Sequence, residues 1–133
     1  MDDLDKPHFR DAGEAREFLE SLRWPEAPVC PRCRTIGGHY RLDGKAHRRG
    51  VWKCHACRAQ FTVTVGTVFG RSKIALNVWL QAVHLLCSST QPISSRHLQR
   101  LLGVSYKTAR SMSRRIREAM KDESFARMAR WVC

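Results

Sequence analysis

Two Cys-x-x-Cys pairs constrain the fold of this chain more than any other feature of its sequence. Cys30 and Cys33 form the first pair, and Cys54 and Cys57 form the second pair after twenty intervening residues. Each pair can chelate one metal ion from one side, and a hairpin between the pairs would bring them together. Four thiolates complete the tetrahedral shell that Zn²⁺ prefers and leave no position for water, so such a site is structural. We therefore expect one structural Zn²⁺ on these four cysteines.

Other uses of the cysteines and nearby histidines fit less well. The acidic N-terminus has no apolar stretch behind it, so a secretory signal is not expected, and thiols inside a cell stay reduced rather than forming disulfides. Two copies with a hairpin between them also match metal geometry better than a redox Cys-x-x-Cys motif. His39, His47 and His55 are alternative ligands, but four cysteines already fill the site. Cys87 lies in an apolar run and is expected in the core, whereas Cys133 has no readable role.

The charge of the chain favours a nucleic-acid partner. Its 133 residues include 24 Lys and Arg against 12 Asp and Glu, a net charge of +12. Residues 1–29 carry eight acids and four bases, whereas residues 30–58 carry eight bases and one acid, and residues 94–120 carry seven bases and one acid. Two basic regions thus follow an acidic start, which suits double-stranded DNA. No run of about eighteen apolar residues is present, so we expect no membrane partner. A small-molecule substrate is not expected either.

Hydrophobic spacing and turn residues predict an α+β fold. Apolar residues at helical spacing predict a helix over residues 11–22, with Asp11 and Glu14 as a capping box. Three runs predict short strands, at residues 39–42, 50–53 and 60–65. A strongly apolar run at residues 74–88 predicts a buried helix. We expect a small zinc ribbon with a β-hairpin or three short strands, followed by a helical domain. The predicted parts are an N-terminal helix with an acidic lead (1–28), the zinc ribbon (29–70), a helix-turn-helix domain (71–120) and a C-terminal tail (121–133).

The pattern of residues 94–120 is typical of a helix-turn-helix, with a short helix, a turn at Gly103 and a longer basic helix from about Tyr106. In such units the second helix enters the major groove by its N-terminal half. The residues expected on its DNA side are Ser105, Tyr106, Lys107, Thr108, Arg110, Ser111 and Arg114, with Arg115 nearer to the DNA backbone. Phosphate contacts are expected from Ser95 and Arg96 in the first helix and from Arg48 and Arg49 in the ribbon. The alternative is an ordinary helical hairpin with a solvated basic face.

The motifs also occur in a familiar order. Phe-Leu-Glu-Ser-Leu-Arg-Trp-Pro at residues 18–25 precedes the two cysteine pairs, and Phe-Thr-Val-Thr-Val-Gly-Thr-Val-Phe at residues 61–69 follows them. Leu-Leu-Gly-Val-Ser-Tyr-Lys-Thr then stands at residues 101–108. This order, over roughly residues 14–120, resembles the N-terminal region of zinc-ribbon insertion-sequence transposases. The resemblance implies a DNA-binding module that recognises the ends of the element and is followed by a DDE-type nuclease domain.

The sequence departs from that family where the nuclease domain would begin. After Asp43 its acidic residues are Glu118, Asp122 and Glu123. Two-metal strand transfer needs clustered carboxylates on a sheet, and these three cannot supply them. We therefore expect the chain to bind DNA without cutting it, and we do not expect an enzyme.

Three functions remain open from the sequence. The first is a bacterial, cytoplasmic, nucleoid-associated regulator of transcription that is derived from a transposase and binds a specific DNA site. The second is the end-binding fragment of an insertion-sequence transposase. The third is an adaptor whose ribbon binds RNA polymerase. The tail, with Phe125, Met128 and Trp131, either continues the preceding helix or is loose, and it could serve a homodimer or the polymerase contact.

Overall fold

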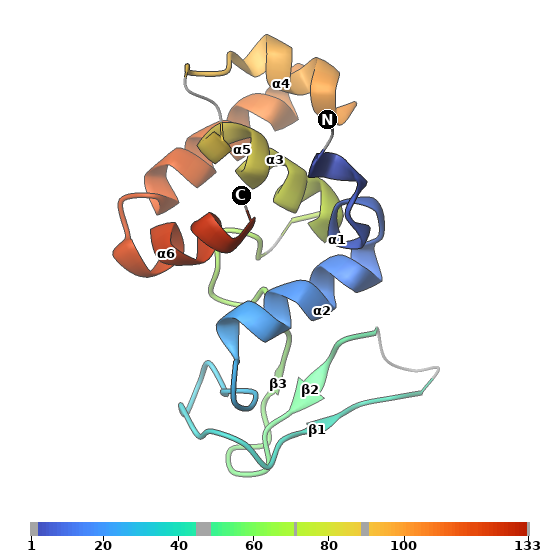
Figure 1. Ribbon diagram of the computed structural model, residues 1–133. Helices are drawn as coiled ribbons and strands as arrows, with labels where there is room; N and C mark the ends of the chain where they lie inside the picture. The colour runs from blue at the N-terminus through green and yellow to red at the C-terminus, as the bar shows by residue number, and fades with distance from the viewer. Residues whose placement is uncertain (1–2, 45–48, 71, 89–90, 133) are drawn as a thin grey trace.

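The structure is a computed structural model that describes residues 3–44, 49–70, 72–88 and 91–132. A small antiparallel sheet lies at one end of the molecule and a group of helices at the other, with helix α2 (Ala12–Arg23) between them (Figure 1). We call residues 29–61 the ribbon and helices α1 and α3–α6 the helical body. This arrangement confirms the α+β fold class.

The sheet of the ribbon consists of three very short strands. Strands β1 (Tyr40–Arg41), β2 (Trp52–Lys53) and β3 (Gln60–Phe61) pair in the order β1-β2-β3, and both pairs are antiparallel. All three lie inside the predicted runs but are shorter than predicted. Strand β3 ends at Phe61 because the residues after it form successive turns rather than extended chain.

The N-terminal region forms three helical pieces. A 3₁₀ turn (η1, Asp3–Asp5) and a one-turn helix (α1, Pro7–Arg10) precede α2, and neither is predicted from the sequence. Helix α2 matches the predicted helix closely, and the Asp11 carboxylate caps it by accepting the N–H of Glu14 at 2.8 Å. Phe9 of α1 is fully buried, so its packing, rather than helix propensity, stabilises this short turn.

Helix α3 (Leu76–Ser88) is the centre of the helical body. Helices α1, α2, α4, α5 and α6 all contact it. Trp79, Leu80, Ala82 and Val83 on α3 are at most 1% exposed. The strongly apolar run in the sequence is therefore a helix that is covered on several sides, as the lack of a polar face predicts.

Helices α4 (Ser95–Leu102) and α5 (Tyr106–Ala119) lie where the sequence predicts two helices and a turn. The Ser94 and Ser105 hydroxyls cap them, each accepting the N–H three residues ahead at 3.1 Å. Gly103 ends α4 in the left-handed region at φ 71°, a conformation that glycine adopts without strain.

The C-terminal residues form a separate helix, α6 (Glu123–Val132). A turn follows α5, and the Asp122 carboxylate then accepts the N–H of Ser124 at 2.8 Å. Ala129 and Val132 are buried, and α6 contacts α3 and α2. The loose-tail interpretation is therefore wrong for the described residues 123–132. The other interpretation is confirmed in that these residues are helical, but the turn before α6 means that they do not continue α5.

Buried residues from every predicted part of the chain join one apolar cluster. It includes Leu19 of α2, Phe61 of β3, Leu80 of α3 and Ala129 of α6. The part boundaries predicted from sequence thus do not separate independent cores, and they stay predictions. Among the described residues, no helix combines the length and the apolar character that crossing a membrane requires.

Candidate metal centre and candidate nucleic-acid interface

Each cysteine pair lies on a tight turn of the same kind. In the first turn the N–H of Arg34 donates to the carbonyl of Cys30 at 2.9 Å, and in the second the N–H of Arg58 donates to the carbonyl of Cys54 at 3.1 Å. Arg34 and Arg58 have φ values of 67° and 66°, so both turns close through a left-handed residue. The two turns therefore present their cysteines in equivalent ways.

The four thiols converge as a tetrahedral metal site requires. All four Sγ atoms lie within 4.8 Å of one another, with Cys30 and Cys57 at 3.6 Å and Cys33 and Cys54 at 3.5 Å. A tetrahedron with metal–sulfur bonds of about 2.3 Å has edges of about 3.8 Å, close to these separations. Cys30 and Cys54 are fully buried. The residues present therefore fit one Zn²⁺ with no protein position left open.

Hydrogen bonds reach the sulfur atoms of Cys54 and Cys33. The N–H groups of Ala56 and Cys57 donate to the Sγ of Cys54 at 3.3 and 3.4 Å. The Thr35 hydroxyl lies 3.2 Å from the Sγ of Cys33, and its hydrogen bond, followed by that of the Thr35 backbone, lowers the pKa of Cys33 to about 6. The Thr35 contact therefore reduces the cost of deprotonating Cys33 when the metal binds. Against the hydrogen bond with the backbone of Ala59, burial and the three neighbouring thiols raise the pKa of Cys57 to about 11.

His39 connects the two cysteine turns without being a ligand. Its Nε2 lies 2.8 Å from the carbonyl oxygen of Thr35 in the first turn, and its Nδ1 accepts the N–H of His55 in the second turn at 3.4 Å. Its ring also meets Phe61 edge to face at 5.5 Å. Both ring nitrogens are occupied, which agrees with a site of four cysteines. No pattern in the sequence predicts this bridging role, and His47 lies outside the described residues.

The first turns of α5 present several of the predicted DNA-facing side chains to solvent. Tyr106, Lys107, Arg110 and Arg114 are exposed, whereas Ala109, Met112 and Ile116 on the opposite face are buried, a division that suits a helix with one free face. Arg96 of α4 lies over the ring of Tyr106 at 5.5 Å, so the starts of the two helices are in contact.

Four polar residues of the same region are only partly free. The Ser105 hydroxyl donates to the hydroxyl of Thr108 at 2.9 Å, so both take part in capping α5. Ser111 is half-buried. Ser95 of α4 is half-buried as well, next to the capping residue Ser94.

Arg115 is directed into the protein instead of toward solvent. Its Nη2 donates to the carbonyl oxygens of Val68 at 2.6 Å and Gly70 at 3.1 Å, and its guanidinium lies over the ring of Trp79 at 5.1 Å. The predicted DNA-backbone contact of this residue is therefore not part of the interface that we propose below.

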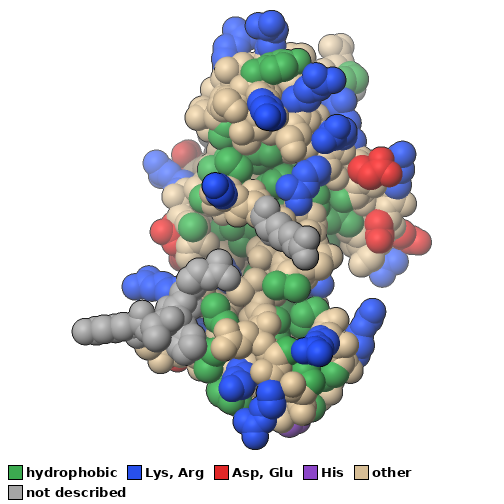
Figure 2. Space-filling view, turned by 180° about the vertical axis from the view of Figure 1, so that it is seen from behind, with side chains coloured by type: hydrophobic (Ala, Val, Ile, Leu, Met, Phe, Trp, Pro, Cys, Tyr) green, Lys and Arg blue, Asp and Glu red, His purple; other side chains and the backbone are tan. Residues whose placement is uncertain are grey.

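Of the two ribbon arginines predicted to contact phosphates, the structure describes one. Arg49 is exposed, and Arg48 lies outside the described residues. Figure 2 shows Lys and Arg side chains over both ends of one face of the molecule, on the helices at the top and on the ribbon at the bottom, while most acidic side chains lie at the sides.

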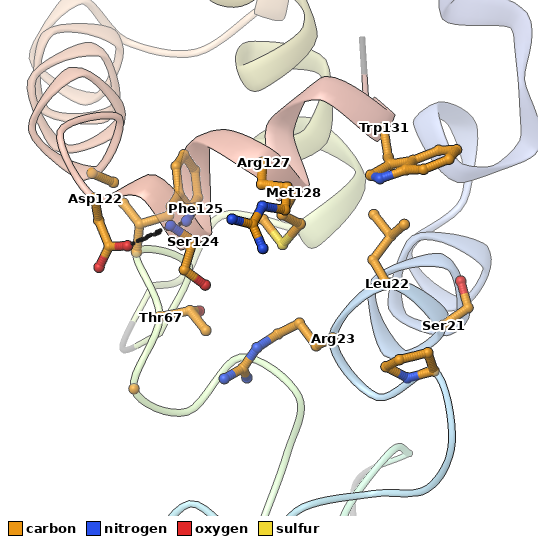
Figure 3. A pocket seen from close by; sticks show the side chains of 14 residues that line it. Ser21, Leu22, Arg23, Thr67, Asp122, Ser124, Phe125, Arg127, Met128 and Trp131 are labelled. Carbon is orange, nitrogen blue, oxygen red and sulfur yellow. Dashed lines mark hydrogen bonds between the residues drawn. The ribbon is translucent and has the colours of Figure 1, made fainter.

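A groove of about 900 Å³ lies apart from both regions (Figure 3). It runs between the end of α2, the chain at residues 66–68 and helix α6, and its apolar lining includes Leu22, Phe125, Met128 and Trp131. Trp131 lines this groove and is 72% exposed.

Comparison with known proteins agrees with the metal centre. Residues 10–60 match the model of the transposase zinc-ribbon domain. The chain is 32% identical over 104 residues to the "Uncharacterized protein in transposable element ISH50" of Halobacterium salinarum, a match that covers 75% of this chain and 33% of that protein. The chain thus spans about one third of the length of this relative. No solved structure matches the chain. The N-terminal part is therefore a transposase-type zinc ribbon, and its four cysteines bind one Zn²⁺.

Proposed function

We propose that this protein, which carries a transposase-type zinc ribbon at residues 10–60, binds double-stranded DNA sequence-specifically and has no catalytic step of its own. Helix α5 reads bases in the major groove, and the ribbon contacts phosphates beside it. The observation that carries the proposal is the exposed, basic first half of α5, held by a buried opposite face and joined to α4 by a glycine-closed turn.

The chemistry of the exposed α5 side chains supports base reading. Arg110 and Arg114 lie four residues apart, so they project from one face of the helix. An arginine fork can donate two hydrogen bonds to guanine, which gives about 1–3 kcal/mol of discrimination against another base. Lys107 in the first turn suits a phosphate contact.

The charge of the ribbon supports a second, sequence-independent contact. Several of its basic side chains are exposed, namely those of Arg32, Arg34, Arg41, Arg49 and Arg58. Basic residues that neutralise phosphates release counterions, so the proposed affinity falls steeply as salt rises.

A pair of variants separates these two contacts. In zinc-loaded protein, Arg110→Ala should relax the sequence preference by about 1–3 kcal/mol, because it removes a base contact. Arg49→Ala should weaken binding to selected and random duplexes alike and lower the salt slope by about one, because it removes a phosphate contact. Arg48→Ala is expected to act like Arg49→Ala.

The measurement is fluorescence anisotropy with a duplex selected from a random library and with a scrambled duplex, over a range of salt concentrations. Equal losses of both variants on both duplexes would contradict a reading helix. Absence of binding by the zinc-loaded wild type would contradict the proposal as a whole.

The biological role divides into two candidates. One candidate is the first of the sequence interpretations, a cytoplasmic, nucleoid-associated transcription regulator. The zinc-ribbon match and the relative in a transposable element support recognition of element ends instead. A genome-wide occupancy profile of the tagged protein distinguishes them, because peaks at promoters indicate regulation and peaks at inverted repeats of mobile elements indicate end binding.

The same profile tests two further expectations. Signal that follows transcribed genes would favour an RNA-polymerase adaptor over both candidates. Peaks at palindromic sites would favour a homodimer, because operator symmetry mirrors protein symmetry. The zinc-free Cys54→Ser variant is the control for each pattern.

A further inference from the structure

Residues 62–70, which follow the ribbon, form a packed element rather than a flexible tether. We call residues 62–70 the connecting segment. Three successive turns close it, with N–H to carbonyl distances of 3.3 Å from Val65 to Thr62, 3.1 Å from Thr67 to Thr64 and 3.1 Å from Gly70 to Thr67. A linker that folds on itself in this way has little freedom to change its length.

Burial holds the connecting segment against the helical body. Val63 is 1% exposed and Phe69 is 4% exposed. Phe69 meets Trp79 of α3 at 5.7 Å and Phe125 of α6 at 6.1 Å between ring centroids. Gly70 is packed so closely that an added Cβ would lie 2.9 Å from the carbonyl oxygen of Thr64.

At the ribbon end, helix α2 holds the connecting segment. Arg23 donates from Nη1 to the carbonyl oxygen of Val63 at 2.5 Å, and Figure 3 shows its side chain reaching from the end of α2 toward this part of the chain. The next residue, Trp24, packs edge to face on Trp52 and Phe61 of the sheet. The ribbon and the start of the segment are therefore fixed together on α2.

At the other end, helix α5 holds the connecting segment through Arg115. The two hydrogen bonds of Arg115 reach carbonyl oxygens that are two residues apart, Val68 and Gly70, and its guanidinium covers Trp79. Arg115 follows the exposed Arg114 on the same helix. The side chain that fixes the segment thus comes from the helix that we propose reads DNA.

We propose that Arg115 is a positioning residue that fixes the distance between the ribbon and α5, so that both contact one DNA duplex at a single spacing. This inference rests on the proposed function and adds a specificity rule to it. The protein recognises the separation of two subsites on the duplex as well as their bases. A rigid connection makes the second contact favourable at one separation and unfavourable at others.

The first test needs no DNA. Nitroxide-bearing residues are incorporated genetically at Tyr40 in β1 and Arg100 in α4, both exposed, so that the cysteines stay free for zinc. Pulsed electron paramagnetic resonance then gives the distance distribution between ribbon and helical body. Arg115→Met, which removes the hydrogen bonds but keeps the bulk of the side chain, should broaden the distribution. Arg114→Ala should leave the distance distribution unchanged, because the Arg114 side chain, at the adjacent position of the helix, is exposed to solvent.

The second test uses duplexes selected from a random library by the zinc-loaded wild type. Hydroxyl-radical footprinting locates the two subsites, and one base pair is inserted between them, which shifts one subsite by about 3.4 Å. The wild type should lose about tenfold in affinity, whereas Arg115→Met should lose less than about threefold, because its ribbon can follow the displaced subsite. Arg114→Ala should bind more weakly but keep the tenfold penalty.

The outcomes separate the inference from the proposed function. A wild type that binds selected DNA but tolerates the insertion, or that shows a single footprint, overturns the inference and leaves the function intact. A wild type that binds no DNA overturns both. If Arg115→Met loses its zinc or its helix content, Arg115→Lys, which keeps the charge and loses the forked geometry, takes its place in both tests with the same expectations.

Discussion

The ribbon and the helical body are stabilised in different ways. The three strands of the ribbon are two residues long each, and the buried apolar residues among its described positions are Cys30, Val51, Cys54 and Phe61. The helical body surrounds α3, where Trp79 and Leu80 are almost completely buried. A metal ion therefore does in the ribbon what apolar burial does in the helical body. Each region should therefore lose stability in response to a different perturbation.

The largest expected effect is the removal of zinc. Structural zinc in small finger peptides is worth on the order of 10–16 kcal/mol near neutral pH, so chelation or Cys54→Ser should unfold the ribbon and leave most of the helix content in place. Heteronuclear NMR should show the loss of ribbon peaks, and circular dichroism the surviving helices. Cys33→His, which still offers a ligand, is the control and should retain zinc. A fully folded, metal-free Cys54→Ser protein would contradict the zinc site and its role in stabilising the ribbon.

The next effect perturbs the other region. Leu80→Ala leaves a cavity in the centre of the helical body and should lower the free energy of unfolding by about 2–5 kcal/mol. Urea unfolding at saturating zinc measures the loss, and the zinc content of the folded variant should stay at one ion per chain. Loss of zinc from folded Leu80→Ala protein would mean that the two regions do not have separate sources of stability.

A smaller effect concerns how the two cysteine turns are held together. His39→Ala removes the bridge between Thr35 and the N–H of His55, and it should weaken zinc binding by about tenfold, because groups around a metal site orient its ligands. Competition with a chromophoric chelator measures the affinity. His97→Ala, an exposed histidine on α4, is the matched control. Equal zinc affinities of the wild type and His39→Ala would show that His39 does not support the metal site.

The smallest expected effect tests the backbone of the first cysteine turn. Arg34 adopts a φ of 67°, which costs a residue with a side chain more than it costs glycine. Arg34→Gly should therefore raise the stability of the zinc-loaded ribbon by about 0.5–1 kcal/mol, measured as a higher thermal midpoint. Arg32→Gly, in the same turn but outside the left-handed region, should give no gain. A gain for both variants would point to charge rather than to backbone conformation.

Local features of the fold could be predicted because their causes lie close together in the sequence. Asp11, Ser94 and Ser105 each cap a helix through the N–H three residues ahead, and Gly103 ends α4 at the following turn. The Thr and Val residues at 62–65 of the connecting segment favour β structure and predict a strand, whereas the turns that form there depend on packing against Trp79 and Phe125.

The four ligands of the metal centre can be predicted from the sequence alone, because the Cys-x-x-Cys spacing closes each turn and zinc chemistry brings the two turns together. Which side chains of a basic helix are exposed to solvent depends on the tertiary structure. Arg114 and Arg115 are adjacent and chemically identical, yet one is exposed and the other donates to a carbonyl 47 residues earlier in the chain. Contacts over such sequence separations follow from how helices pack, and no local pattern encodes them.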